Sequence, residues 1–372
     1  MPRFSIVVPT SDRSEYLLHC LTTLGSLGDD YEVIIQDNSV GDETQELCQY
    51  LKYPFVYFRT KPVGMRQNWE NGIANATGDY VTVLGDDDGF MPGGLQTVRD
   101  VLSTHEADLV TWTPHSYWWP DAPLEHKQDL LYLYRPERMA VPFIPRLSVR
   151  AFMDNPDLFC FEQLPMIYNS FVKRSVIEEI VKRDGYYLNH DIPDVWSGVV
   201  NGMTARDGLQ LRTPVTIRGI GGKSGGAGTR GKNHKQVHAG LRKAKVKYCH
   251  PALVESMCLA IHVNSVKLSG YEWFADQLPQ LRLDVGKIID NMLYEIAENS
   301  DRRAEILKDA DKLAKKYGHP FDVAAFKKHK FGTPARECGW KEGYIAVDCK
   351  HIPSVKTIYD ASVLAAAIVG TP

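Results

Sequence analysis

The sequence has no long hydrophobic run. No apolar stretch of its 372 residues approaches the roughly 20 that cross a bilayer, and Met1 leads into a short strand-like run without a secretory leader. Cysteines are few, and the seven are scattered without a CxxC pair, which excludes a zinc ribbon or a disulfide framework and indicates reduced thiols. We therefore expect a cytoplasmic protein.

The composition lacks any extreme. Hydrophobic residues make up 44% of the chain, charged residues 24%, and the net charge is −3. These values exclude disordered, collagen-like and coiled-coil proteins and predict no bulk attraction to nucleic acid. Acidic residues are absent between Asp207 and Glu255, although this stretch is rich in lysine and arginine. An anionic partner is expected to contact it.

Familiar phosphate-binding glycine motifs are missing or incomplete. The first predicted strand ends in VPTSDR (8–13) and not in GxGxxG. The main sequence signal of a dinucleotide-binding dehydrogenase is therefore absent. A dense glycine run spans Gly219–Gly231, and Gly226–Lys232 satisfies GxxxxGK, but Asn233 stands where a P-loop needs Ser or Thr. We interpret this run as a flexible loop whose cations Lys223 and Arg230 close over a diphosphate, or alternatively as a surface linker.

Residues 1–115 alternate between strand and helix patterns. Short β-branched runs bounded by turn residues predict buried strands, and the segments between them have helical spacing. This alternation predicts an α/β fold with a mainly parallel central sheet, helices on both faces, and ligands beyond the carboxyl ends of the strands. The expected strands are Phe4–Val8, Glu32–Ile35, Phe55–Phe58, Tyr80–Leu84 and Asp108–Trp112.

The rest of the chain divides into three parts. Residues 114–161 are rich in proline and aromatic residues and predict a long irregular insertion. Strand and helix patterns return up to about residue 218, and helical stripes dominate from residue 251. We expect one domain over residues 1–232, with halves 1–115 and 116–232, and a mostly helical C-terminal extension over 233–372.

Carboxylates follow two of the predicted strands. Asp37 ends the second strand, and the fourth ends in Asp86, Asp87 and Asp88. Three consecutive carboxylates repel one another, so a divalent cation is expected to compensate their charge, unless the run is a solvated acidic turn. Asp37 is likewise either a ligand contact or the cap of a turn before Asn38-Ser39.

The segments FSIVVPTSDR, YEVIIQDNS and NGIANATGDYVTVLGDDD resemble the nucleotide-sugar-binding half of family 2 glycosyltransferases, which have the GT-A fold. The resemblance covers residues 3–115 and, more weakly, 165–230. It implies a GT-A type nucleotide-binding sandwich and an inverting enzyme that depends on Mg²⁺ or Mn²⁺. Such an enzyme moves a sugar from a nucleotide-diphosphate-sugar donor to a glycan or glycolipid acceptor.

The resemblance also implies a donor site. Pro9, Thr10 and Arg13 fall where the family wraps the base and ribose, Asp37 where it contacts the base, and Arg66 where it often helps to hold the donor.

The family's Asp-x-Asp motif corresponds to Asp86 and Asp88, one facing the ribose and the other the metal ion. The two are therefore the candidate metal ligands, and Asp86 and Asp87 are also expected to contact the donor. Gly85 stands where the family more often has its first Asp, which leaves the role of Asp87 open.

An inverting transfer needs a general base for the acceptor hydroxyl, and the family supplies an Asp at a helix start well beyond the metal motif. Asp191 and Asp194 are the candidates here. Asp194 is preferred because it directly precedes an apolar helical run, although a plain helix cap would look the same. His190 is a further candidate for the base or for a metal contact.

Two other functions stay open. Gly225–Arg230 spells the GGxGTR of nucleotidyltransferases, which would make the nucleotide sugar and release pyrophosphate. The sheet could also serve as a non-catalytic carbohydrate-binding or scaffold module. The basic stretch 232–247 predicts either peripheral contact with the inner face of a membrane or an ordinary solvated helix face.

Overall fold

Alternating strands and helices build the first part of the chain, and all five strands expected there are confirmed. The computed structural model describes residues 3–25, 27–224, 249–278, 282–298, 300–328 and 335–370. The elements of the first part are β1 (Phe4–Thr10), α1 (Ser14–Leu24), β2 (Tyr31–Asp37), α2 (Glu43–Cys48), β3 (Val56–Arg59), α3 (Met65–Ala74), β4 (Tyr80–Val83), β5 (Gly89–Phe90), α4 (Gly94–Thr104) and β6 (Leu109–Trp112).

The expectation of an irregular insertion over residues 114–161 is wrong, because three strands and a helix form there. Residues on both faces of β7 are buried, and in β8 half-buried tyrosines alternate with buried leucines, so neither strand has a clear alternation of apolar and polar residues. The elements that follow β6 are β7 (His115–Trp118), β8 (Leu130–Tyr134), β9 (Ala140–Phe143), α5 (Pro145–Asp154), η1 (Cys160–Gln163), η2 (Ile167–Asn169), β10 (Ser170–Lys173), α6 (Arg174–Asp184), α7 (Pro193–Thr204), β11 (Gly208–Leu211) and β12 (Thr216–Ile220).

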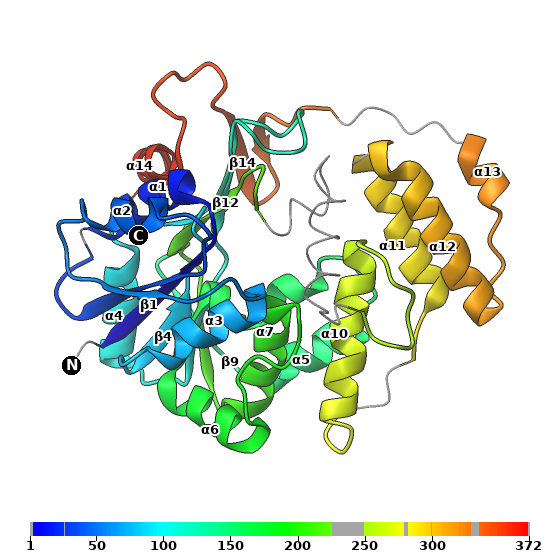
Figure 1. Cartoon of the computed structure of the whole chain (residues 1–372), viewed down its shortest axis with the longest axis horizontal. Coiled ribbons are helices and arrows are strands. Elements are labelled where there is room, and N and C mark those ends of the chain that lie inside the picture. Colours follow the sequence, from blue (N-terminus) through cyan, green and yellow to red (C-terminus); the bar gives the residue numbers. More distant parts are fainter. Residues whose placement is uncertain are drawn as a thin grey trace.

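The larger sheet has eight strands in the order β3-β2-β1-β4-β10-β6-β11-β9. The strands β3, β2, β1 and β4 run parallel, and β10 is antiparallel to both of its neighbours. Successive β1 residues alternate between two cores: Val7 packs with α3 and α7, whereas Ile6 and Val8 pack with α1 and α4. Figure 1 shows this sheet between its helical layers. The predicted α/β fold is therefore confirmed.

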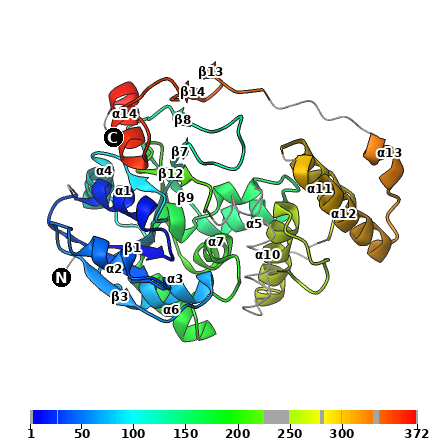
Figure 2. The ribbon, with the colours of Figure 1, turned by 45° about the horizontal axis from the view of Figure 1, so that its top comes forward.

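A smaller sheet combines strands from three distant parts of the chain. Its order is β13-β14-β8-β7-β12-β5, in which β13 (Gly339–Lys341) and β14 (Tyr344–Asp348) come from the C-terminal region. The last helix, α14 (Ile358–Val369), packs against α1 and β5. Figures 1 and 2 both show this C-terminal segment returning to the side of the molecule where α1 lies. Residues 339–369 thus complete the first domain and do not continue the helical extension.

The helical layer consists of α10 (Leu259–Trp273), α11 (Val285–Glu298), η3 (Ser300–Arg302), α12 (Arg303–Tyr317) and α13 (Val323–Lys328). Helix α10 is buried on two sides. Val263 and Val266 belong to the core that lies beneath α7, whereas Ile261 and Leu268 belong to the core of α11 and α12. The extension is therefore joined to the sheet domain by a continuous apolar interface.

Candidate active site

The adjacent strands β1 and β4 bring the predicted donor residues together at their carboxyl ends. The hydroxyl of Thr10 donates to Asp86 Oδ2 at 2.7 Å. Arg13, directly before α1, places Nη1 2.9 Å from Asp86 Oδ1 and Nη2 3.0 Å from Asp87 Oδ2. Pro9 is buried in β1 in register with Gln36. The described structure therefore unites Thr10, Arg13 and the acidic run in one cluster.

Arg13 supplies the positive charge that the acidic run requires. Burial raises the pKa of Asp86 to about 6, and the Arg13 guanidinium opposes that rise. For Arg13 itself, burial disfavours the charged form, but Asp86 and Asp87 raise its pKa above the ordinary value. Arg13 therefore compensates part of the charge of Asp86 and Asp87, and a divalent cation at the run stays a prediction.

Asp88 is turned toward the backbone of β12. Its Oδ1 accepts from the Gly219 N–H at 2.7 Å and its Oδ2 from the Gly85 N–H at 3.1 Å. Burial, followed by the neighbouring Asp87, raises the pKa of Asp88 to about 7, while a hydrogen bond from Tyr168 opposes the rise. Asp88 therefore links the end of β4 to β12.

Two glycines make this packing possible. A Cβ on Gly219 would lie 1.8 Å from the Asp87 carbonyl oxygen, so no other residue fits where β12 crosses the acidic run. A Cβ on Gly85 would lie 2.6 Å from Asp88 Oδ2. Gly219 lies within β12, which ends at Ile220, so the glycine-rich run begins inside a strand.

The carboxylates of Asp86, Asp87 and Asp88 can be compared with the ligands that a divalent metal ion prefers. Mg²⁺ is typically bound by one or two carboxylates together with substrate phosphates. Within the described ranges, no three His, Cys, Asp or Glu side chains gather as they would around a metal ion. These carboxylates therefore suit a divalent cation only in company with diphosphate oxygens. Asp88 and Asp86 stay the predicted ligands.

Asp37 has both carboxylate oxygens engaged inside the protein. Oδ1 accepts from the Ser39 N–H at 2.8 Å, and Oδ2 accepts from the Tyr57 hydroxyl at 2.7 Å. The side chain is fully buried. The structure therefore shows Asp37 capping a turn, as one of the two interpretations expected, and its contact with a donor base stays a prediction.

Arg66 connects the donor half to the loop before α7, which carries Asp191. It lies in the first turn of α3, and its Nη1 donates to the Leu188 carbonyl oxygen at 2.9 Å. Its Nε lies 3.7 Å from Asp191 Oδ1. Asp191 therefore has a cation beside it.

Asp194 lies in the first turn of α7, where negative charge is favoured. Its Oδ1 accepts from the Val195 N–H at 2.9 Å. Burial raises the pKa of Asp194, and this backbone hydrogen bond and the charge of Arg218 oppose the rise. A part-buried carboxylate with a raised pKa has the properties of a general base.

Arg218 on β12 is a half-buried cation that the sequence interpretation did not single out. Its positive charge opposes the rise in the pKa of both Asp88 and Asp194. Nη2 donates to Ser116 Oγ at 3.3 Å, Nη1 lies 3.6 Å from Glu162, and the buried Nε has no hydrogen-bond partner. The only signal in the sequence was its place in the stretch without acidic residues.

The start of the glycine-rich run contacts α1 and the acidic cluster. Lys223 Nζ lies 2.5 Å from Glu15 at the exposed surface, and the Ser224 hydroxyl donates to Asp87. Ser224 is thus a second contact that the sequence did not identify. Arg230 and the basic stretch 232–247 lie outside the described residues.

His190 is buried in contacts with the protein itself. Its Nδ1 accepts from the Ile192 N–H at 3.1 Å, and its ring stacks on Trp196 with centroids 5.7 Å apart. Burial, together with nearby His262 and His250, lowers its pKa to about 4. This arrangement gives His190 neither a metal partner nor the properties of a base.

Among the helices described, none is long and apolar enough to span a bilayer.

Comparison with known proteins agrees with this geometry. Residues 5–171 match the family described as "Glycosyl transferase family 2". A GalNAc(5)-diNAcBac-PP-undecaprenol beta-1,3-glucosyltransferase of Campylobacter jejuni is 32% identical over 104 residues, which are 26% of this chain and 34% of that protein. Abequosyltransferase RfbV of Salmonella typhimurium is 28% identical over 113 residues, covering 28% of this chain and 34% of that protein.

The chain thus spans about a third of the length of these two curated relatives. A crystal structure of S. aureus TarS 1-349 in complex with UDP-GlcNAc aligns at a TM-score of 0.45 with 13% identity, over 87% of this chain and 93% of that chain.

Proposed function

We propose that this chain, whose residues 5–171 form a family 2 glycosyltransferase domain, transfers a sugar from a nucleotide-diphosphate-sugar donor to a glycan or glycolipid acceptor with inversion. One observation carries the proposal: Thr10, Arg13, Asp86 and Asp87 contact one another at the carboxyl ends of β1 and β4. Ligands of open α/β sheets bind beyond such strand ends.

On the donor side, Thr10 and Arg13 hold Asp86 and Asp87 in place before a ligand arrives. Such preorganisation avoids reorganisation during the reaction. The donor contacts of Pro9, Asp37 and Arg66 belong to this proposal. A Mg²⁺ or Mn²⁺ ion held by Asp88 and Asp86 would neutralise charge on the diphosphate.

On the acceptor side, Asp194 takes the proton of the attacking hydroxyl. It is preferred to Asp191 because Asp194 lies in the first turn of α7, whereas Asp191 lies before the helix with the Arg66 guanidinium beside it. Burial raises the pKa of Asp194, a property that suits a general base.

The acceptor is proposed to be a lipid-linked glycan. The Campylobacter jejuni relative is named for transfer to a polyprenyl-diphosphate-linked glycan, which supports this class of acceptor. We propose that the basic stretch 232–247 contacts the inner face of the membrane, where lysine and arginine are attracted to anionic lipids.

The test is a panel of nucleotide sugars and nucleoside triphosphates, each with Mn²⁺ or with a chelator. The proposal predicts nucleoside diphosphate from one nucleotide sugar. A nucleotidyltransferase would instead consume a triphosphate and release pyrophosphate. A non-catalytic module would bind a glycan without releasing either product.

A separate variant tests whether Asp88 is a metal ligand. Asp88→Asn should abolish the part of donor affinity that depends on Mn²⁺. Metal-dependent donor affinity that is equal in Asp88→Asn and the unmodified chain would remove Asp88 from the ligand set.

A further inference from the structure

The loop between α6 and α7 carries Asp191, leads directly into the first turn of α7 with Asp194, and is held from two sides. Arg66 of α3 holds it from the donor half, through the Leu188 carbonyl oxygen and Asp191. On the other side lies α10 of the helical layer, whose Ser265 Oγ is 3.4 Å from His190 Nε2. A segment outside the family match therefore contacts the loop next to Asp194.

The hydrogen bonds of His190 determine its protonation state. The Ile192 N–H can only donate, so Nδ1 of His190 must accept and carries no proton. The proton of the neutral ring is then on Nε2, which points to Ser265 Oγ. Ser265 is fully buried, and its Oγ also accepts from the His250 N–H at 2.8 Å.

The bond to Ile192 fixes the residues that lead into α7. Ile192 directly precedes the helix, its carbonyl oxygen accepts from the Trp196 N–H at 3.0 Å, and Pro193 and Asp194 follow in the first turn. The His190–Ile192 turn thus determines where the first turn of α7 begins. A change in this turn moves the Asp194 carboxylate.

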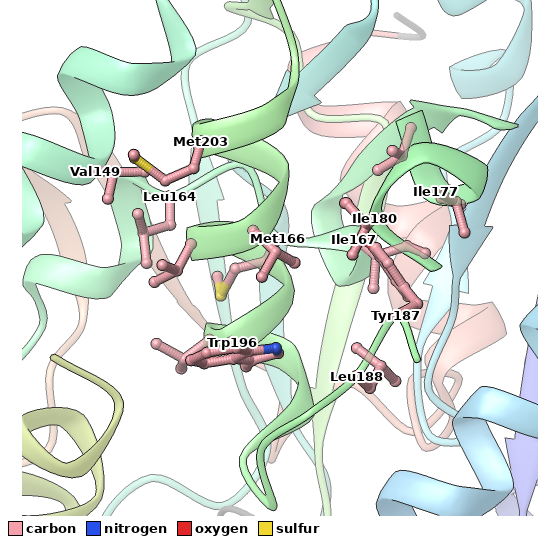
Figure 3. Packing of buried hydrophobic residues seen from close by; sticks show 14 of the residues in the cluster. Val149, Leu164, Met166, Ile167, Ile177, Ile180, Tyr187, Leu188, Trp196 and Met203 are labelled. Atoms are coloured by element: carbon pink, nitrogen blue, oxygen red, sulfur yellow. The ribbon is translucent and has the colours of Figure 1, made fainter. Parts of the chain in front are cut away.

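Aromatic packing makes the arrangement rigid. His190 stacks on Trp196 at an interplanar angle of 18°, and Trp196 contacts Trp273 of α10 edge to face at 5.9 Å. Figure 3 shows Trp196 on α7 beside the loop that carries Leu188. Burial keeps His190 neutral, because it lowers the pKa to about 4.

We infer that His190, backed by Ser265 of α10, is a positioning residue that sets the placement of Asp194, and that the helical layer is thereby part of the transferase site. The inference rests on the proposed function for its kinetic consequence. Its structural consequence, protection of the Ile192 amide, does not depend on any activity.

The experiment compares two variants that differ in where they place a polar atom. In His190→Asn, the side-chain oxygen is bonded to Cγ as Nδ1 is and can accept from Ile192. In His190→Gln, the polar atoms lie farther out, near the position of Nε2, and the Ile192 N–H loses its acceptor. Only His190→Gln should therefore break the hydrogen bond that holds the turn between residues 190 and 192.

For His190→Gln we expect kcat for nucleoside diphosphate release from the nucleotide sugar to fall about 10- to 100-fold, since a misplacement of roughly 1 Å can cost that much. The donor KM should stay unchanged, because the donor cluster is not in contact with His190. Hydrogen exchange at Ile192 should accelerate. His190→Asn should keep both kcat and protection close to those of the unmodified chain.

His115 offers a matched control. It is also buried, and its Nδ1 also accepts a backbone hydrogen bond, from the Tyr134 N–H at 3.1 Å. Burial lowers its pKa to about 4 as well. His115→Gln should therefore lose a comparable amount of stability while kcat is kept.

The outcomes separate the two hypotheses. If His190→Gln leaves kcat and Ile192 protection unchanged, or if His115→Gln lowers kcat equally, the positioning role is overturned. If the unmodified chain releases no nucleoside diphosphate from any nucleotide sugar, the proposed function fails, and faster Ile192 exchange in His190→Gln alone would still support the turn.

Discussion

The donor end and the acceptor end of the site balance charge in opposite ways. At the donor end, Asp86 and Asp87 share the Arg13 guanidinium at 2.9 and 3.0 Å. At the acceptor end, Asp194 has only a backbone N–H at 2.9 Å and the more remote charge of Arg218. A carboxylate held by a contacting cation is a poor base, whereas a part-buried carboxylate without one is a good base.

The two ends also differ in how they are assembled. The donor cluster is contributed mainly by the adjacent strands β1 and β4, with contacts from β12. The acceptor loop is held by side chains of α3 and α10, which lie far apart in the sequence. The donor end can therefore be read from a local motif, but the acceptor end requires the tertiary structure.

The largest effect is expected at the acceptor end. Asp194→Asn should lower kcat by about 10² to 10⁴-fold, the usual contribution of a general base, with donor affinity kept. The measurement is the release of nucleoside diphosphate at saturating donor. Asp191→Asn is the matched control, and a reversal of the two results would transfer the role of base to Asp191.

Removal of the shared cation tests the donor end. Arg13→Gln leaves Asp86 and Asp87 buried without their partner, and breaking such a pair costs about 3–5 kcal/mol. Chemical denaturation should show a loss of this size, together with weaker donor binding. Adding Asp87→Asn should restore part of the stability. Losses that simply add in the double variant would mean that Arg13 does not compensate these carboxylates.

A pH profile tests the link between the two ends. Burial raises the pKa of Asp194 and Arg218 lowers it, and the base acts in its ionised form, so activity falls as pH drops through this pKa. Arg218→Gln should raise the pKa further and move the acid limb of kcat to higher pH. Arg218→Lys should leave the limb near its original position. If the acid limb does not move in Arg218→Gln, Arg218 does not affect the pKa of the base.

The smallest effect is expected at the edge of the donor end. Tyr57→Phe removes the hydroxyl that donates to buried Asp37 Oδ2 and should cost about 1–3 kcal/mol of unfolding free energy. Kinetics should change little, because Ser39 still holds Oδ1. A large loss of donor affinity in Tyr57→Phe would show that the orientation of Asp37 matters for the donor.

The sequence by itself determined the strands of the first part and the gathering of Thr10, Arg13 and Asp86 at one sheet edge. Buried parallel strands have a short apolar pattern, and adjacent parallel strands bring their carboxyl ends together. It also supplied the alternatives for Asp37 and the two candidate bases.

Only the tertiary structure decided the partners of these residues. Strands β7 and β8 were hidden because β7 is buried on both faces and β8 alternates buried leucines with half-buried tyrosines, so the apolar-polar alternation of a half-exposed strand is absent. Gly219 looked like a loop residue because a close approach of 1.8 Å to the Asp87 carbonyl oxygen leaves no local signal. Ser265 is ordinary in sequence, and long-range packing alone places it beside His190.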